Sequence, residues 1–322
     1  MKLLLASVLT VAMAGGVHGA DRASGFPSKP IRWVLPFPPG GPSDAVARLI
    51  GERLSVRLKQ PVIVDNRTGA SGGIGMEMAA RAAPDGHTIV FGAPGSVVIN
   101  PLLYSLNVDP LAELTAVSRL TTFAFVLIAN PALPARTIPE LLEAARSKPA
   151  SLTCGAGAAL QQVACELLRM RGQVAITTVP YKGSAPAMNE LVGGQISFMF
   201  EVPNVAIGQV KANRVRAIAT SGPHAGSGPF AHLPAINDTL AGFEVESWFG
   251  VLAPRATPRD IVLRLDDELG TILADEDVRK RLLEAGLEPA HASSETFAEI
   301  MRRDRARYSK LIREAGIKGD GP

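Results

Sequence analysis

Cysteine, aromatic residues and net charge are all scarce in this sequence. The 322 residues include two cysteines, two tryptophans and three tyrosines, and the net charge at pH 7 is only +3. No basic stripe with interleaved aromatics exists, so we predict no nucleic-acid partner. The histidines are scattered, and no spacing of His, Cys, Asp or Glu resembles a metal site, so we predict no bound metal.

Long hydrophobic runs are also absent beyond the N-terminus. There, Lys2 precedes the apolar stretch LLLASVLTVAMAGG, which small residues follow. A charged start and an apolar segment too short to cross a bilayer are typical of a secretory signal peptide. We expect export and cleavage between about Gly19 and Gly25, and we exclude residues 1–25 from the fold. A retained membrane anchor is the alternative interpretation.

The two cysteines are Cys154 and Cys165. An oxidising compartment permits a disulfide, but its Cα atoms must lie within about 7 Å of each other. Cys154 is predicted to end a strand and Cys165 to lie two turns into the next helix. This placement predicts too large a separation, so we expect two buried free thiols.

The order of predicted elements indicates an α/β protein. With 47% hydrophobic residues, the chain is long enough for about two domains. Apolar strands at 31–37, 62–66 and 88–94 each precede a helical pattern, and a second such series runs to residue 222. This alternation predicts doubly wound parallel sheets with helices on both faces.

Two longer strands, at 121–131 and 244–254, interrupt the two series. We interpret them as an antiparallel two-strand hinge between lobes. Lobe 1 is then residues 26–125 plus 250–322, and lobe 2 is residues 126–249. Ligand sites favour the cleft between such domains.

A glycine-rich turn lies within VLPFPPGGPSDAVARLIGERL, residues 34–54. Gly40 and Gly41 let the backbone approach a ligand closely. We expect Ser43 or Asp44 to cap the following helix, whose first amides lack internal partners. Those amides, the positive end of the helix dipole and the Ser43 hydroxyl predict an anion pocket. A tight turn without a ligand is the alternative.

A matching turn lies in the second series, in CGAGAALQQVACELL, residues 154–168. Ala158 and Ala159 offer amides without bulky side chains. Neither turn has the G-x-x-x-x-G-K-[ST] pattern of a phosphate loop. Two such turns facing each other favour a carboxylate ligand, because a few charge-assisted hydrogen bonds satisfy it.

Three further residues, Ser71, Lys182 and Glu201, each allow a functional and a structural interpretation. Ser71 in GASGG, residues 69–73, matches the nucleophile elbow of a secreted serine hydrolase, although an elbow serine directly follows its strand. Lys182 and Glu201 sit at predicted strand ends, where open sheets bind ligands. Lys182 either attracts an anion or is a solvated turn residue. Glu201 either accepts a hydrogen bond from the ligand or holds water, or else caps the next helix.

The whole chain resembles one family. PSKPIRWVLPFPPGGPSDAVARL, VIVDNRTGASGGIG, APDGHTIVFG, INPLLY, VPYKGSAPAMNELVGGQISFMF and SWFGVLAP occur in the order seen in the Bug family of periplasmic solute-binding proteins, which serve tripartite tricarboxylate transporters. The likeness runs from about Pro27 to Ile317. It implies a type II periplasmic-binding-protein fold that closes on a small carboxylate, without catalysis. It also implies a monomer that delivers its ligand to membrane permease subunits or reports it to a sensor.

The resemblance places the ligand between two loops. The first loop is 37–44, the second loop is 156–159, and the segment around Ser96 lines the same cleft. Where relatives usually offer hydroxyls in the second loop this chain has alanines, and Glu201 replaces their frequent Asp. These departures favour a less hydroxylated carboxylate. The predicted ligand-binding residues are Phe37, Gly40, Gly41, Ser43, Asp44, Ser96, Ala156, Gly157, Ala158, Ala159 and Glu201.

Overall fold

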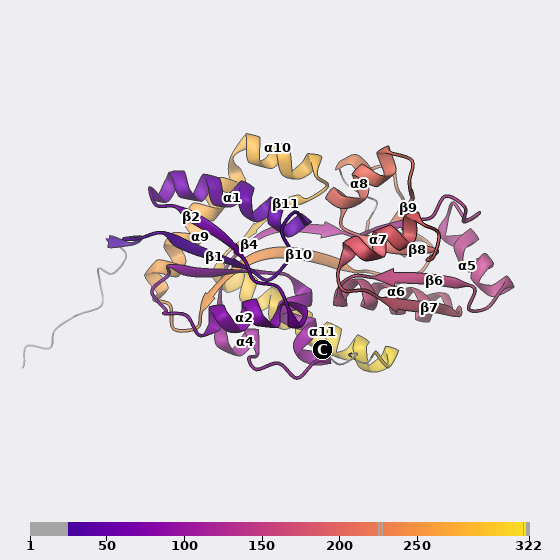
Figure 1. The fold of residues 1–322 in the computed structure, drawn as a ribbon, viewed down its shortest axis with the longest axis horizontal. Helices are drawn as coiled ribbons and strands as arrows, with labels where there is room; N and C mark the ends of the chain where they lie inside the picture. The colour runs from indigo at the N-terminus through magenta and orange to yellow at the C-terminus, as the bar shows by residue number, and fades with distance from the viewer. Residues whose placement is uncertain (1–24, 225, 227, 318, 320–322) are drawn as a thin grey trace, which may run out of the picture.

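The computed structural model describes residues 25–317 and 319, except 225 and 227. The predicted signal peptide therefore lies outside the described residues. Two β-sheets organise the described chain, each at the centre of its own lobe (Figure 1). None of the described helices is both long enough and apolar enough to cross a bilayer.

The first sheet has six strands and mixes directions. Strands β1, β2 and β3 are parallel, whereas β10 runs antiparallel to both β3 and β4, and β11 antiparallel to β4. In order across the sheet, the strands are β11 (Glu288–Ala292), β4 (Leu114–Ala124), β10 (Glu246–Pro254), β3 (Thr88–Gly92), β1 (Ile31–Leu35) and β2 (Val62–Asn66).

The second sheet has five strands and is also mixed. Strand β6 is parallel to β7 and β8, whereas β5 is antiparallel to β8 and β9. The α/β alternation is therefore confirmed, but each sheet also has antiparallel strands. The order is β7 (Ile176–Pro180), β6 (Leu152–Ala156), β8 (Phe198–Glu201), β5 (Val126–Ala129) and β9 (Arg216–Thr220).

Helices cover both faces of the first sheet, with α1 and α10 on one side and α2, α4 and α11 on the other (Figure 1). This lobe contains α1 (Pro42–Leu58), α2 (Gly73–Ala80), α3 (Asn100–Leu103), α4 (Pro110–Glu113), α9 (Arg259–Ala274), α10 (Glu276–Glu284) and α11 (Ser294–Ala315), with short turns η2 (Ala70–Gly72) and η3 (Gly95–Ile99). The other lobe contains α5 (Ile138–Ser147), α6 (Ala159–Gly172), α7 (Ser184–Val192), α8 (Pro203–Lys211), η4 (Gly228–Phe230) and η5 (Ile236–Asp238).

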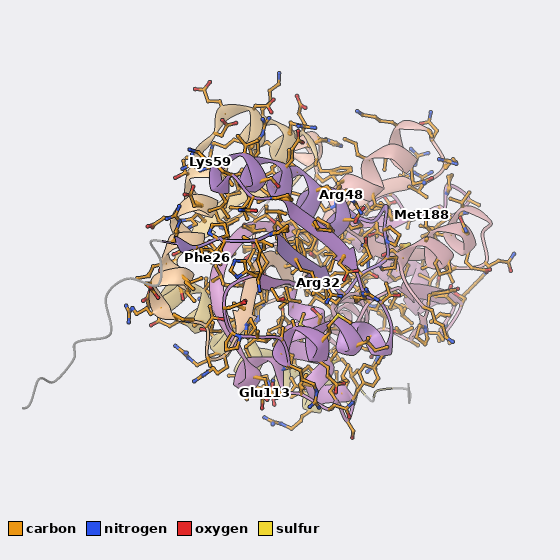
Figure 2. All side chains as sticks on the ribbon, turned by 60° about the vertical axis from the view of Figure 1, so that its left-hand side comes forward. Phe26, Arg32, Arg48, Lys59, Glu113 and Met188 are labelled. Atoms are coloured by element: carbon orange, nitrogen blue, oxygen red, sulfur yellow. A yellow bond between two sulfur atoms is a disulfide. The ribbon has the colours of Figure 1, made fainter. Side chains whose placement is uncertain are left out.

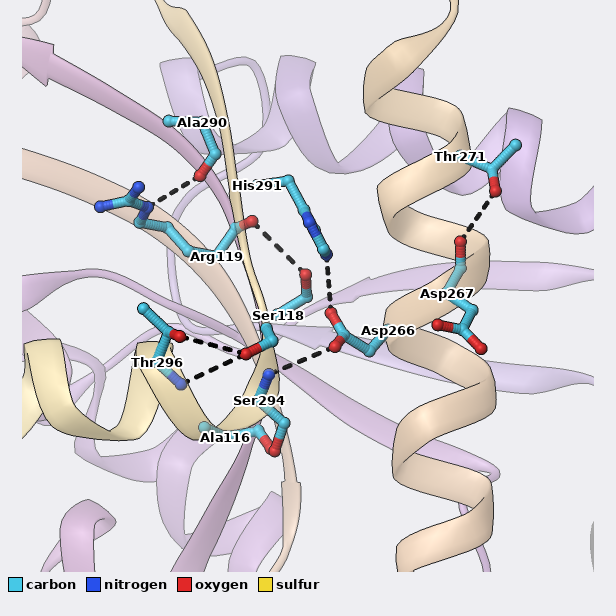
Figure 3. A network of polar contacts seen from close by, with 11 residues as sticks. Ala116, Ser118, Arg119, Asp266, Asp267, Thr271, Ala290, His291, Ser294 and Thr296 are labelled. Atoms are coloured by element: carbon cyan, nitrogen blue, oxygen red, sulfur yellow. Dashed lines mark hydrogen bonds and ion pairs between the residues drawn. The ribbon is translucent and has the colours of Figure 1, made fainter.

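The packing of α9, β11 and α11 closes the first lobe at its C-terminal end. Asp266 of α9 accepts hydrogen bonds from His291 Nε2 at 2.8 Å and from the amide of Ser294 at 3.2 Å (Figure 3). Ser294 Oγ in turn donates to the carbonyl of Ala116 in β4 at 2.8 Å. The start of α11 is thereby attached both to a helix and to the sheet.

The predicted crossing strands are present, with shifted ends. β4 begins at Leu114 and pairs antiparallel with β10, and the chain passes through Phe125 into β5 of the other sheet. Ser221, which is fully buried, lies between the two crossings. Its amide donates to the Phe125 carbonyl at 2.9 Å, and its Oγ accepts from the Phe125 amide at 2.9 Å.

The same serine also holds the second crossing. Its carbonyl accepts from the Val245 amide at 2.7 Å, and its Oγ donates to the Val245 carbonyl at 2.5 Å. From α11, Asp304 accepts from Trp248 Nε1 at 2.8 Å, and Tyr308 Oη donates to the Glu246 carbonyl at 3.2 Å. Hydrogen bonds from both lobes therefore fix the backbone where the chain crosses.

The prediction of free thiols is wrong, because Cys154 and Cys165 form a disulfide with Cα atoms 6.0 Å apart. The turn between β6 and α6 is so short that the helix folds back along its own strand. Two helical turns, about 9 Å of rise, return Cys165 to the level of Cys154. The separation expected from the sequence was too large, because it did not include the return of the helix along its own strand.

Removing the hydroxyl in Ser221→Ala should lower the free energy of unfolding by about 1–3 kcal/mol. The variant leaves the buried Phe125 amide and Val245 carbonyl without these partners. Urea denaturation measures the loss. Ser147→Ala, which removes an exposed hydroxyl bonded to Ala144, is the control and should cost less than about 0.5 kcal/mol. Equal stability of the two variants would contradict the proposed role of Ser221.

Replacing both cysteines by alanine should destabilise the protein by about 3 kcal/mol, because the bond closes a loop with a sequence separation of 11. Urea denaturation with and without reductant checks this. Reductant should shift the midpoint of the wild type towards that of the double variant and leave the double variant unchanged. A wild type insensitive to a reductant that demonstrably cleaves the bond would refute the expectation.

Candidate functional site

The first loop, 37–44, joins the carboxyl end of β1 to the start of α1. Gly40 has a φ of +76°, a left-handed conformation that glycine adopts without strain. No described residue accepts a hydrogen bond from the amides of Gly41, Ser43 and Asp44. Because these amides stand at the positive end of the α1 dipole, the loop has the donors that an anion requires.

The Asp44 carboxylate is not free, because it is hydrogen-bonded within the loop and holds the loop in position. Its Oδ2 accepts from the Gly40 amide at 3.0 Å, and Arg48 binds both oxygens at 2.9 and 3.0 Å. Asn66 Nδ2 donates to Asp44 Oδ1 at 3.1 Å and to the Phe37 carbonyl at 3.0 Å. Arg48 projects from α1, as Figure 2 shows. The Gly40 amide is therefore occupied by Asp44 in this structure.

The charge of Asp44 is well compensated. Burial opposes ionisation, but hydrogen bonds from Arg48, Gly40 and Asn66 outweigh it and lower the pKa of Asp44 below its usual value. The carboxylate and the Arg48 guanidinium form a neutral pair, so Asp44 does not repel an anion strongly from the neighbouring amides.

The predicted cap of α1 is wrong in one respect. Neither Ser43 nor Asp44 is the N-cap, because the helix begins at Pro42 and its N-cap is Gly41. Proline suits the first helical position, since its φ is already helical and it has no amide to satisfy. The helix therefore starts earlier than the sequence pattern indicated, and Ser43 and Asp44 both lie in its first turn.

The second loop, 156–159, repeats this design between β6 and α6. Ala158 is the N-cap, and Gln161 Oε1 accepts from the Gly157 amide at 2.7 Å, as Asp44 does from Gly40. In both loops the accepting side chain lies four residues after the glycine. No described residue accepts from the amides of Ala158, Ala159 and Leu160.

Gly157 is required by close packing. A Cβ atom there would lie 2.5 Å from Gly183 C and from Ser184 N, at the start of α7. The second loop therefore packs directly on the turn that follows β7, and any larger residue would separate the two. Gln161 Nε2 donates to Ser184 Oγ at 3.3 Å across this contact.

Ser96 lies in η3, at the carboxyl end of β3, and is only 3% exposed. Its Oγ bonds to the backbone of Ala93, accepting at 3.4 Å and donating at 3.3 Å. The η3 turn of the first lobe contacts α6 of the second lobe, and α11 also contacts α6. Segments carrying predicted site residues thus meet across the two lobes.

Glu201 ends β8 and has no exposed surface. Its Oε1 accepts from the Val202 amide at 2.7 Å and from Ser184 Oγ at 3.4 Å, and no described residue donates to its Oε2. Burial raises the pKa of Glu201 to about 7, although the two hydrogen bonds oppose the shift. The side chain bonds the first amide beyond its own strand, so part of its role is local.

The two remaining candidates differ in their surroundings. Lys182 is exposed beside the second loop, in the turn before α7. Ser71 is exposed in η2, five residues beyond the end of β2, and its carbonyl accepts from Asn100 Nδ2. No hydrogen bond links Ser71 Oγ to a described histidine, and no described group of His, Cys, Asp and Glu has the arrangement of a metal site.

Sequence reasoning missed three side chains that hold the loops in place, Arg48, Asn66 and Ser184, and it expected Gln161 to be a donor to the ligand and not the residue that holds the second loop. The one available signal was the placement of an acceptor in the first helical turn, four residues after a glycine, at Asp44 and at Gln161. Asn66 reaches the first loop from the end of β2, and Ser184 reaches the second loop from the start of α7, so only the tertiary structure reveals them.

Glu201→Gln should change how stability depends on pH. Burial raises the pKa of Glu201 from 4.5 to about 7, so its protonation stabilises the folded wild type fully below pH 4.5. This contribution to the free energy of unfolding is lost progressively as the pH rises to about 7. Relative to the non-titrating variant, the wild type should lose about 3 kcal/mol of unfolding free energy between pH 4.5 and 8. Urea denaturation across this range measures the difference.

Glu190→Gln is the matched control, because Glu190 is exposed on the neighbouring α7. Its difference from the wild type should not show this pH dependence. A constant difference between wild type and Glu201→Gln over the whole range would show that Glu201 titrates normally.

Comparison with known proteins gives consistent matches over most of the chain. A protein from Pseudomonas sp. strain P51, from the tcbD-tcbE intergenic region, is 36% identical over 95% of this chain and 92% of its own length. Protein BugT of Bordetella pertussis is 30% identical over 99% of each chain.

Solved structures agree in fold. R. palustris Rpa4515 with adipate superposes with a TM-score of 0.87 at 32% identity, covering 92% of this chain and 100% of that one. The periplasmic binding protein BugD gives a TM-score of 0.81 at 30% identity, with 92% and 100% coverage. MatC from Rhodopseudomonas palustris, with bound malate, gives 0.81 at 29% identity over 89% of this chain and 100% of its own.

These neighbours confirm the type II periplasmic-binding-protein fold that the motifs predicted. The resemblance to the Bug family is confirmed as well, by BugT in sequence and by BugD in structure. The family described as tripartite tricarboxylate transporter family receptor, TctC, matches residues 46–317. This chain belongs to that family of periplasmic solute-binding receptors.

Proposed function

We propose that this protein binds a small carboxylate between its two lobes and delivers it to the permease subunits of a tripartite tricarboxylate transporter. The observation that carries the proposal is the repeated loop design. Each lobe presents a helix N-terminus with amides that lack acceptors among the described residues, and a side chain four residues after a glycine holds each loop. The adipate and malate held by two structural neighbours support a carboxylate as the ligand.

The ligand contacts in this proposal are mostly backbone amides. Gly41 and Ser43 grip one side of the anion, and Ala158 and Ala159 grip the other, with Phe37, Ser96 and Ala156 lining the space around them. Each charge-assisted hydrogen bond contributes a net of roughly 1.5–3 kcal/mol, so a few of them support micromolar binding after the cost of ordering the ligand.

The second loop favours an acid with few hydroxyl groups. Ala158, Ala159 and Leu160 provide amides but no side-chain donor or acceptor. A hydroxylated tricarboxylate would leave its hydroxyls without partners there, which is costly in a closed site. We propose a linear or aromatic mono- or dicarboxylate as the ligand class, and adipate is the first compound to test.

Closure of the lobes is part of the proposed function. We assign residues 26–125 plus 250–322 to one lobe and 126–249 to the other, with the pivot at the crossings that Ser221 bridges. A carboxylate contacted from both lobes stabilises the closed state by its higher affinity for it. We further propose export by a cleaved signal peptide, action as a monomer and no catalytic activity.

A thermal-shift screen against mono-, di- and tricarboxylates tests the function. Adipate or a similar acid should raise the unfolding temperature in a concentration-dependent way, because it binds only the folded state. Amino acids and inorganic phosphate are the comparison ligands. If no carboxylate raises the unfolding temperature or shows heat in titration calorimetry, the proposal is refuted.

Gly41→Val should weaken adipate binding at least about tenfold, equal to about 1.4 kcal/mol. Gly41 has a φ of −82°, and only the Pro38 carbonyl oxygen lies near a Cβ there, at 3.6 Å, so the backbone accepts the change. The loss would come from the valine methyl groups, which occupy the space in front of the amides. Lys182→Ala is the comparison variant and should change affinity by less than about threefold.

Isothermal titration of both variants with adipate provides the measurement. Equal losses in the two variants would indicate a grip by side-chain charge and would contradict binding through the backbone amides of the first loop.

A further inference from the structure

Glu201 lies at the end of a continuous chain of hydrogen bonds that begins in the second loop. The Gly157 amide donates to Gln161 Oε1 at 2.7 Å, and Gln161 Nε2 donates to Ser184 Oγ at 3.3 Å. Ser184 Oγ then donates to Glu201 Oε1 at 3.4 Å. The chain connects a buried carboxyl group to the loop that presents the amides of Ala158 and Ala159.

In this series of hydrogen bonds, each group donates towards Glu201. Because the Gly157 amide can only donate, Gln161 must face it with Oε1 and turn Nε2 towards Ser184. The Ser184 hydroxyl accepts that bond and is left to donate its proton towards Glu201. A carboxylate at Glu201 thus completes the series of hydrogen bonds.

Among the described residues, no cation contributes to the pKa of Glu201. Its hydrogen-bond partners are Ser184 at the start of α7 and the amide of Val202, the N-cap of α8, and its strand neighbour on β5 is Val126. The titratable groups around α7 are Tyr181, Lys182 and Glu190, and none of them contributes to the shift in the pKa of Glu201. The group is buried, and no described residue donates to its Oε2.

We propose that Glu201 couples carboxylate capture to proton uptake, so that an anion seated on the amides of the second loop draws a proton onto Glu201. The inference rests on the proposed function, because it requires an anionic ligand at that loop. No bond other than that to the proton forms or breaks. The proton comes from solvent, and the ligand remains an anion.

The physical reason is repulsion between like charges in a poorly solvated region. An anion at the N-terminus of α6 adds negative potential at Glu201, which raises the pKa of its carboxyl further. Since burial already raises that pKa to about 7, the group in the free protein is mostly ionised at pH 8. Binding at pH 8 therefore takes up as much as about one proton per ligand.

Linkage gives a reciprocal effect. If the anion favours protonated Glu201, protonated Glu201 favours the anion by the same factor. Affinity should fall several-fold between pH 7 and 8.5, a range in which adipate itself stays fully ionised.

The test is titration calorimetry with adipate at pH 8 in phosphate and in Tris, whose ionisation enthalpies differ. The wild type should show a buffer-dependent heat corresponding to about 0.5–1 proton taken up per adipate. Glu201→Gln cannot titrate, so it should show little buffer dependence and a flat affinity between pH 7 and 8.5. Glu190→Gln removes an exposed charge on α7 that takes no part in this series of hydrogen bonds, so the variant should behave like the wild type.

A second measurement does not depend on whether the variant folds. In the wild type with 13C-labelled glutamate carboxyls, one carboxyl should titrate near pH 7 and move to higher pH when adipate saturates the protein. Adipate binding without buffer-dependent heat, or without this shift, would overturn the coupling and leave the proposed function intact. If no carboxylate binds at all, the proposed function fails and the coupling fails with it.

Discussion

The candidate site depends most on the backbone amides at the N-termini of α1 and α6, which have no acceptor among the described residues. An amide cannot be placed at will, because its direction follows from the backbone on both sides of it. In each lobe a side chain in the first helical turn reaches back to the amide of a preceding glycine, Asp44 to Gly40 and Gln161 to Gly157. That bond holds the loop, and the next amides have no acceptor among the described residues.

Both loops are held by a side chain that accepts from a glycine amide, but the two side chains differ in charge. Asp44 carries a charge, and Arg48 and Asn66 neutralise and fix it. Gln161 is neutral, and its other end continues through Ser184 to a buried carboxyl group. The carboxylate beside the first loop is therefore compensated by a neighbouring cation. In the second lobe, the charge near the loop depends on the protonation of Glu201.

The crossings between the sheets place these loops relative to each other. Ser221 bonds both crossing segments, at Phe125 and at Val245, while Trp248 and the Glu246 carbonyl are held by α11. Buried hydrogen bonds of this kind are costly to break, so they fix the backbone of the crossing segments.

Periodicity, glycine-rich turns and ordered motifs determined much about this protein without any coordinates: the α/β alternation, the crossing strands and the family. These features are local, because an apolar strand or a first helical turn is visible within a few residues. Tertiary structure decided the rest. The Cys154–Cys165 disulfide follows from a helix that reverses along its strand, and the contacts of Asn66, Ser184 and Ser221 join segments distant in sequence. Such pairings depend on where strands end in space, which spacing along a chain does not specify.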